Sequence, residues 1–429
     1  MKPTMPLKIL VLSLATWIAS SALAQDQAST QETAPVTTPA ETSPPTNAMP
    51  VPPADEQTPR TDLPRETAIE NPLGRAPAIA GSAFGGYGEL TLNVPSNAPG
   101  VVDLRRVVLF FGHDFTDRIR FYSEVEVEHA VASADDQGEV EIEQAYLDGL
   151  LGRRLNLRGG LILMPMGIVN TYHEPPSFNG VDRPDVDQFV IPSTWREPGL
   201  GIFGELTEGL RYQLYVVNGF NANGFTAESA IREGHQEAQL AHAADYGAIG
   251  RLDYEPILGT VLGVSAYGGR SGNTLTSTVG RVPIGLFDID ARIHRGGFSA
   301  RGEVALLLVG DAAALNQALL SGTAEQQGAG PVASQARGAY AEVAYDLLRL
   351  LAPGSEQSLA AFTRFDYADT QASVPTGFAA RAELRRYSQM VGLTYRPIPQ
   401  IALKADYRRH WLGSGEDFGE FASAITWLF

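Results

Sequence analysis

Alternation of apolar and charged residues with a period of two recurs along this chain from Gly81 to its last residue, Phe429. In the segment 118–129 one face is apolar and carries Ile119, Phe121, Val125 and Val127. The other face carries Arg118, Arg120, Tyr122, Glu124, Glu126 and Glu128. The two faces of a strand alternate in this way, and a soluble sheet seldom has charges of both signs so densely on every strand. We therefore interpret the apolar face as facing lipid and the charged face as lining a water-filled lumen.

The pattern predicts an all-β fold, a transmembrane antiparallel β-barrel of about sixteen strands. The candidate strands begin near residues 83, 103, 117, 139, 155, 199, 210, 245, 259, 284, 297, 336, 357, 386, 400 and 418. The last one, 418–429, carries aromatics near both ends of its apolar face, as the closing strand of an outer-membrane barrel does. Short and long connections alternate, and an even number of strands puts both termini on the short, periplasmic side.

Three regions follow from composition. Residues 1–24 combine Lys2 and Lys8, a short apolar stretch and Ala22-Leu23-Ala24, which is the pattern of a secretory signal peptide. Residues 25–80 are rich in Pro and Thr with few large apolar residues, and they predict a disordered periplasmic segment. Residues 81–429 form the barrel.

Composition also excludes several classes of function. The chain has no cysteine, which removes disulfides, thiolate metal sites and cysteine nucleophiles. Its formal net charge of −17 argues against nucleic acid as a partner. Arginine greatly outnumbers lysine, and Lys404 is the single lysine of the barrel. Arginine is common in pore walls, but the codon bias of a GC-rich genome explains the ratio equally well.

The longest connection, residues 166–199, follows the fifth predicted strand and is rich in proline and aromatic residues. Proline fixes the backbone and aromatic side chains need burial, so this segment is expected to pack against something. Inside a sixteen-stranded barrel that surface is the inner wall. We predict that this third extracellular loop folds inward and narrows the channel.

The sequence also resembles the phosphate-selective porin O and P type of outer-membrane barrel. The resemblance spans most of 81–429 and rests on segments 163–167, 173–176, 181–184, 191–197, 215–219 and the ending from Lys404. It implies a sixteen-stranded, trimeric diffusion channel with an infolded third loop. The phosphate-specific members use several lysines in the lumen. This barrel has only Lys404, so the resemblance is carried over for the architecture and not for the solute.

Ten residues are candidates for the pore lining and the constriction, because they combine charge with a lumen-facing or loop position. They are Arg118, Arg120, Arg292, Arg301, Arg408, Glu174, Asp182, Arg183, Asp185 and Arg196. Opposed charges across a narrow water column orient dipolar solutes and set ion preference. The alternative for each residue is a cross-strand ion pair that only stabilises the wall.

The sequence gives little support for an enzymatic function. His173 and Glu174 lack the helical spacing of a zincin, so we favour a structural role in the loop and predict no metal ligand, no catalytic residue and no cofactor. The sequence predicts a non-enzymatic porin of a Gram-negative outer membrane. It would be a homotrimer in contact with membrane lipid and lipopolysaccharide, passing small hydrophilic solutes or ions. The alternative is a plugged or rim-active barrel, either a hydrolase or an adhesin.

Overall fold

A computed structural model describes residues 78–79, 81–133, 137–272 and 280–429. The expected signal peptide, 1–24, lies outside the described residues, as does the expected periplasmic segment 25–80 except for 78–79. Among the described residues, no helix combines the length and the apolar character that crossing a membrane requires.

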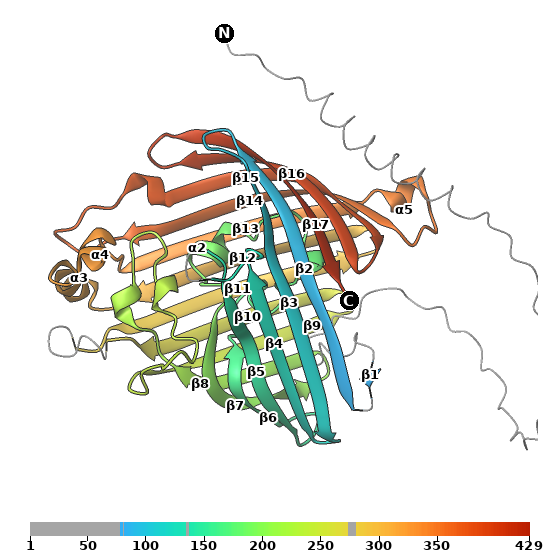
Figure 1. Ribbon diagram of the computed structural model, residues 1–429, viewed down its shortest axis with the longest axis horizontal. Coiled ribbons are helices and arrows are strands. Elements are labelled where there is room, and N and C mark those ends of the chain that lie inside the picture. The colour runs from blue at the N-terminus through green and yellow to red at the C-terminus, as the bar shows by residue number, and fades with distance from the viewer. Residues whose placement is uncertain (1–77, 80, 134–136, 273–279) are drawn as a thin grey trace, which may run out of the picture. The chain divides into compact units, whose positions relative to one another are not determined.

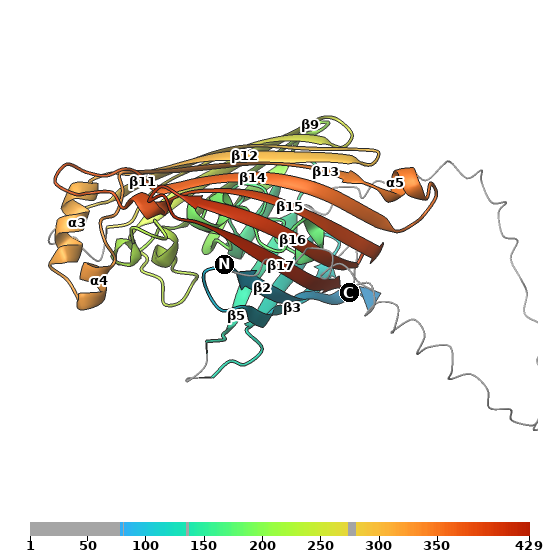
Figure 2. The same cartoon turned by 90° about the horizontal axis from the view of Figure 1, so that it is seen from above.

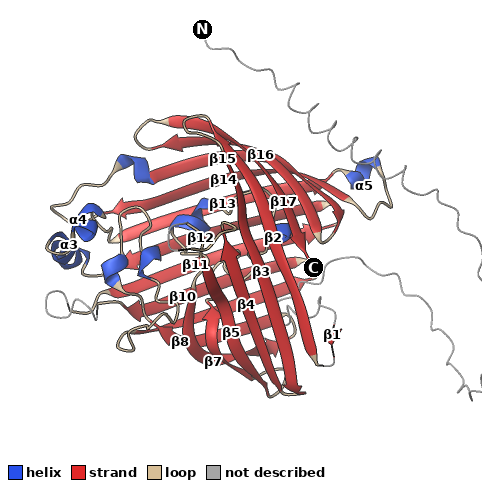
Figure 3. Cartoon of the chain, in the orientation of Figure 1, coloured by secondary structure: helices blue, strands red, loops and turns tan. Residues whose placement is uncertain are grey.

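Sixteen antiparallel strands form a closed barrel, which confirms the predicted fold class (Figures 1 and 3). Each strand pairs with its neighbours in sequence, and the barrel closes where β17 pairs with β2. A two-residue strand, β1 (Ala78–Ile79), also pairs with β2. The strands are β2 (Ser82–Pro95), β3 (Val101–Thr116), β4 (Ile119–Glu128), β5 (Val140–Leu150), β6 (Asn156–Leu163), β7 (Arg196–Thr207), β8 (Leu210–Asn218), β9 (Tyr246–Ile257), β10 (Thr260–Arg270), β11 (Pro283–Arg295), β12 (Phe298–Val309), β13 (Gln335–Asp346), β14 (Ser358–Ser373), β15 (Arg385–Ile398), β16 (Ile401–Leu412) and β17 (Asp417–Leu428).

The connections differ strongly between the two ends of the barrel. One end has turns such as 117–118, 208–209, 258–259 and 296–297, with the short helix α5 (Leu348–Leu351) in the connection from β13 to β14. The other end has the long connections 164–195, 219–245 and 310–334. Figures 1 and 2 show α3 and α4 at this second end and α5 at the opposite one. The helices within the long connections are η3 (Pro175–Ser177), α2 (Asp185–Phe189), η4 (Ala222–Gly224), η5 (Arg232–Gly234), α3 (Ala312–Leu320), α4 (Ala324–Gly328) and η7 (Ala382–Leu384).

Burial on the strands is inverted relative to a soluble sheet. On β11, Ile289 is 67% exposed, whereas its neighbours Asp288 and Asp290 are 1% and 2% exposed. On β12, Val304 is 60% exposed and Glu303 is 2% exposed. In a closed barrel the buried face is the interior, so apolar side chains point outward and charged side chains point inward. This arrangement suits a lipid environment, where an outward-facing charge is costly.

Candidate functional site

The connection 164–195 makes hydrogen bonds to several strands around the barrel. The backbone N–H of Ile168 donates to Glu303 on β12 at 3.1 Å, and that of Val181 donates to Asp406 on β16 at 2.8 Å. The guanidinium of Arg251 on β9 donates to the carbonyl of Gly167 at 3.1 Å. The segment also carries α2, which packs against β12, β13 and β14.

These bonds explain part of the dense charge on the inner face. A loop that leaves water carries backbone N–H and C=O groups that need partners. Here interior carboxylates accept from the loop N–H groups, and interior arginines donate to the loop carbonyls. Arg364 on β14, for example, donates to the carbonyl of Asp182 at 3.0 Å. The inner wall therefore binds the loop backbone as well as pairing charges between strands.

A polar cavity of about 130 Å³ lies between this loop and the wall formed by β2 and β3. Four arginines and two carboxylates supply its charge, and the side chains that line it are Glu89, Arg105, Arg106, Phe178, Val181, Asp182, Arg183, Gln188, Ser193 and Arg232. They come from two strands and from two separate connections, 164–195 and 219–245. The side chains that line the cavity carry four formal positive charges and two formal negative charges.

Ion pairs neutralise the wall side of this cavity. Arg106 Nε lies 3.1 Å from Glu89, and its Nη1 lies 3.3 Å from Glu126. Arg105 lies 3.0 Å from Asp182. These pairs hold the two arginines of β3 in fixed positions.

Unused hydrogen-bonding capacity lies on both sides of the cavity. On the wall side, the buried Oε2 of Glu89 accepts no hydrogen bond from the described residues. On the loop side, Arg183 donates from Nη1 to Thr194 Oγ1 at 3.0 Å, while its buried Nη2 has no hydrogen-bond partner among the described residues. The buried Oγ of Ser193 has none either. Burial, together with the nearby Arg106, lowers the pKa of Arg183 to about 10, so the group is still charged at neutral pH. These atoms of Arg183 and Ser193 can donate to a solute that enters the cavity.

The predicted site residues divide between this cavity and other places. Asp182 and Arg183 line it. Arg118 lies exposed in the turn before β4, because that strand begins at Ile119. Arg120 pairs with Asp114 at 2.6 Å near the same turn. Glu174 is half-buried in the connection 164–195.

The other five predicted residues occupy ion pairs. Arg301 lies 3.0 Å from Glu342 on the neighbouring strand β13. The remaining pairs are Arg292 with Asp253 at 3.6 Å, Arg408 with Asp185, and Arg196 with Glu141. The pair of Arg408 with Asp185 joins β16 to the connection 164–195, whereas the pairs of Arg292, Arg301 and Arg196 join strands to one another.

Sequence reasoning missed Glu89, Arg105, Arg106 and Arg232. Arg105 and Arg106 are adjacent, which breaks the alternation that selected the other candidates. Two successive arginines directly before the apolar run 107–111 of β3 are the available signal. Arg232 comes from a different loop, and nothing in its local sequence indicates that it approaches 164–195.

Known proteins include a sequence relative of this chain and several structures with the same fold. No protein-family model matches the chain. An uncharacterized protein of Aquifex aeolicus (strain VF5) is 36% identical over 354 residues, which are 81% of this chain and 80% of that protein. The chain belongs to the family of this Aquifex protein.

Solved structures with the same fold include three outer-membrane proteins. OmpF of Salmonella typhi, in complex with daunomycin, is 11% identical with a TM-score of 0.54, over 81% of this chain and 97% of that one. The outer-membrane channel DcaP of Acinetobacter baumannii is 11% identical with a TM-score of 0.51, over 82% and 99%. An anion-selective porin from Comamonas acidovorans is 9% identical with a TM-score of 0.51, over 81% and 100%. At this level of identity the likeness establishes the porin fold.

Proposed function

We propose that this protein is an outer-membrane porin, a passive channel for small hydrophilic solutes and ions with no catalytic step. The observation that carries the proposal is the polar cavity between the connection 164–195 and the wall of β2 and β3. The hydrogen bonds from this loop to β12 and β16 support a constriction in which solute would pass beside the loop, through this cavity. The connection 164–195 would thus be the constriction, and the porin-fold neighbours support a channel in general.

The charge of the cavity favours small anions. Its four arginines exceed its two carboxylates, and two hydrogen-bond donors on its loop side are free. A fixed positive potential in a narrow, poorly screened space raises the local anion concentration. Ser193 would add a neutral donor beside the guanidinium of Arg183.

Phosphate selectivity of the lysine-dependent kind is not part of the proposal. Lys404 is 3% exposed, and its Nζ donates to two loop carbonyls. The ammonium of Lys404 thus uses its hydrogen bonds to hold the loop. The likeness to the phosphate-selective porin type therefore supports the channel architecture and the homotrimer, but not that solute.

The proposed setting is the outer membrane of a Gram-negative bacterium, with lipid and lipopolysaccharide around the barrel and the N-terminal segment in the periplasm. The outward-facing apolar side chains of the strands support it. The competing candidate is a plugged or rim-active barrel. A rim hydrolase would need free acids, and the neighbouring acids Asp288 and Asp290 lie 3.7 Å and 2.7 Å from Arg251 in a buried ion-pair cluster.

Conductance of the folded protein in a planar bilayer under a salt gradient tests the proposal. Steady ohmic steps with a reversal potential of anion-selective sign are expected. Deleting residues 172–194 should raise the unit conductance, because the constriction is removed. A matched control deletes 312–328, the segment of α3 and α4 at the end of the barrel, and should leave the unit conductance nearly unchanged. Silence from a correctly folded wild-type barrel would contradict the porin and favour the plugged alternative.

A further inference from the structure

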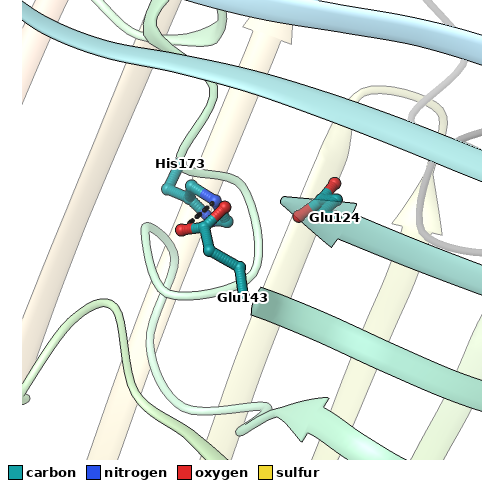
Figure 4. A group of neighbouring side chains, drawn as sticks. All are labelled: Glu124, Glu143 and His173. Carbon is teal, nitrogen blue, oxygen red and sulfur yellow. Dashed lines mark ion pairs between the residues drawn. The ribbon is translucent and has the colours of Figure 1, made fainter. Parts of the chain in front are cut away.

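A second group of polar side chains lies where the connection 164–195 meets β4 and β5. Glu124 comes from β4, Glu143 from β5 and His173 from the connection, and all three are buried (Figure 4). One ligand atom from each lies within 4.8 Å of the other two. Figure 4 shows the His173 ring against the Glu143 carboxylate, with the Glu124 carboxylate beside them. Two carboxylate oxygens and one imidazole nitrogen are a donor set that divalent metal ions accept.

Negative charge is in excess around this group. Glu126 and Glu141 are neighbours of Glu143 in an overlapping cluster of possible ligands. The nearby arginines are engaged with other acids: Arg106 with Glu89 and Glu126, and Arg196 with Glu141 and Glu237. Among the described residues, the ion pair of Glu143 is with His173, while Arg106 and Arg196 make their own closest contacts to other acids. Burying two carboxylates beside a single imidazole is costly unless a further positive charge compensates them.

An unsatisfied oxygen points into the group. Glu143 has a fully buried side chain, and within the described part of the chain its Oε1 accepts no hydrogen bond of normal geometry. His173 Nε2 lies 3.4 Å from this oxygen. The other oxygen, Oε2, accepts from the Tyr87 hydroxyl at 3.2 Å. A buried carboxylate oxygen without a donor is rare in proteins and calls for a bound group.

The orientation of His173 is the third observation. Its Nδ1 lies 3.3 Å from the carbonyl oxygen of Asn170. In the tautomer with the proton on Nδ1, that nitrogen donates to the carbonyl and the lone pair of Nε2 faces Glu143. Asn170 is itself fixed by donating to the carbonyls of Met164 and Trp195. Metal-binding histidines are oriented in this way, by a hydrogen bond from the nitrogen that does not bind the metal.

Hydrogen bonds also orient the carboxylates of Glu124 and Glu143. Gln144 donates to Glu124 Oε2 at 2.8 Å, and Tyr122 donates to the other oxygen of Glu124. The Tyr87 hydroxyl, 2.9 Å from His173 Nε2, can keep its bond to Glu143 when that nitrogen takes a different partner. Bonds of about 2.1 Å allow ligand atoms to be at most about 4.2 Å apart, so a small closure of the side chains completes the site.

We propose that Glu124, Glu143 and His173 bind one divalent transition-metal ion, with Zn²⁺ or Mn²⁺ matching the mixed nitrogen and oxygen ligands. The ion would fasten the connection 164–195 to β4 and β5. The site does not depend on the channel function, since it rests only on these three side chains and the groups that orient them.

Titration with the metal alone tests the proposal. The mature protein is folded in detergent, treated with a chelator and titrated with Zn²⁺ in a calorimeter, and Co²⁺ is added in parallel for its visible absorption. One ion per chain is expected, with a Co²⁺ spectrum that shows nitrogen and oxygen ligands. His173→Gln and Glu143→Gln should each weaken Zn²⁺ binding by more than about 100-fold, because loss of a ligand costs more than loss of an orienting partner.

His235→Gln is the matched control. His235 is also in a long connection and beside an acid, Glu237, at 3.5 Å, but it lies outside the three-residue group. Its substitution should leave Zn²⁺ affinity unchanged. Folding of each variant is checked by circular dichroism, and Glu124→Gln replaces His173→Gln if the latter does not fold.

Absence of saturable Zn²⁺, Mn²⁺ and Co²⁺ binding by the wild type would overturn the proposal. Unchanged affinity in the folded ligand variants, or an equal loss in His235→Gln, would overturn it as well. Because binding is measured in detergent without conduction, its failure would leave the porin proposal intact. A silent channel would likewise leave the metal site intact.

Discussion

Lys404 donates from Nζ to the carbonyl oxygen of Gly180 at 2.8 Å, and the same ammonium donates to the Pro175 carbonyl at 2.6 Å. The one lysine of the barrel thus joins β16 to the connection 164–195. The ammonium also lies 4.0 Å from the centre of the Phe178 ring. Three contacts to one short stretch make Lys404 an anchor for the loop.

Replacing this anchor is the first prediction. Lys404→Met keeps the length of the side chain but removes the donor, leaving two buried carbonyls without a partner at about 1–3 kcal/mol each. The urea concentration at which the barrel unfolds should fall, and single-channel current should fluctuate more because the loop is loosened. Arg118→Met, in an exposed turn, is the control and should change neither quantity. A quiet, wild-type current in Lys404→Met would show that the loop position does not depend on this contact.

The second prediction concerns Trp195, at the C-terminal end of the same connection. Trp195 is fully buried, and its ring centre lies 5.0 Å from those of Phe220 and Tyr267. Trp195→Ala removes a large side chain from this aromatic cluster and should lower the free energy of unfolding by about 3–5 kcal/mol. Urea unfolding followed by circular dichroism measures it. Trp411→Ala is the control, since Trp411 is 40% exposed on the strand β16 and should cost much less.

The strands could be predicted well from sequence, because one face of each meets lipid and the other does not. A shift of one residue would exchange these faces, so the alternation fixes each strand strongly. All sixteen begin within three residues of the predicted positions, and the largest difference is at β7, expected at Gly199 and found at Arg196. The smaller difference at the start of β4 has the larger consequence for the site, because it places Arg118 in an exposed turn and not on the barrel wall.

The sites could be predicted less well, because they depend on contacts between distant segments. The sequence places His173 beside Glu174, and that pair alone indicates a structural role in the loop. Its carboxylate neighbours are instead Glu124 and Glu143, from two other elements. Likewise, the loop sequence predicts a site role for Arg183, whereas no local pattern predicts one for Arg232 on another loop. Periodicity identifies a face of a strand; it does not say which loop residue reaches that face.

The third prediction concerns ion preference. Arg183→Gln and Arg232→Gln each remove one positive charge from the cavity while keeping a polar side chain. The ratio of anion to cation permeability should fall by at least about twofold, because the cavity balance moves toward neutrality. Reversal potentials under a salt gradient measure the ratio. Arg153→Gln is the control: its side chain is 67% exposed and pairs with Glu205, away from the cavity. An equal shift in this control would assign selectivity to the overall charge of the protein.

The last prediction concerns Asp187 in α2. Its buried carboxylate oxygens have no hydrogen-bond partner in the portion of the chain that the structure describes. Burial, reinforced by the nearby Asp288, raises the pKa of Asp187 from 3.8 to about 8. The folded protein therefore keeps this proton at pH values where the unfolded chain has lost it, and stability falls as pH rises from about 4 to about 8. Asp187→Asn mimics the protonated form and removes this loss. Relative to wild type, the variant should gain stability as pH increases through that window, reaching more than about 1 kcal/mol at its upper end. Urea unfolding at about pH 5 and about pH 8 measures the difference. A gain that does not change with pH would mean that Asp187 ionises normally in the folded protein.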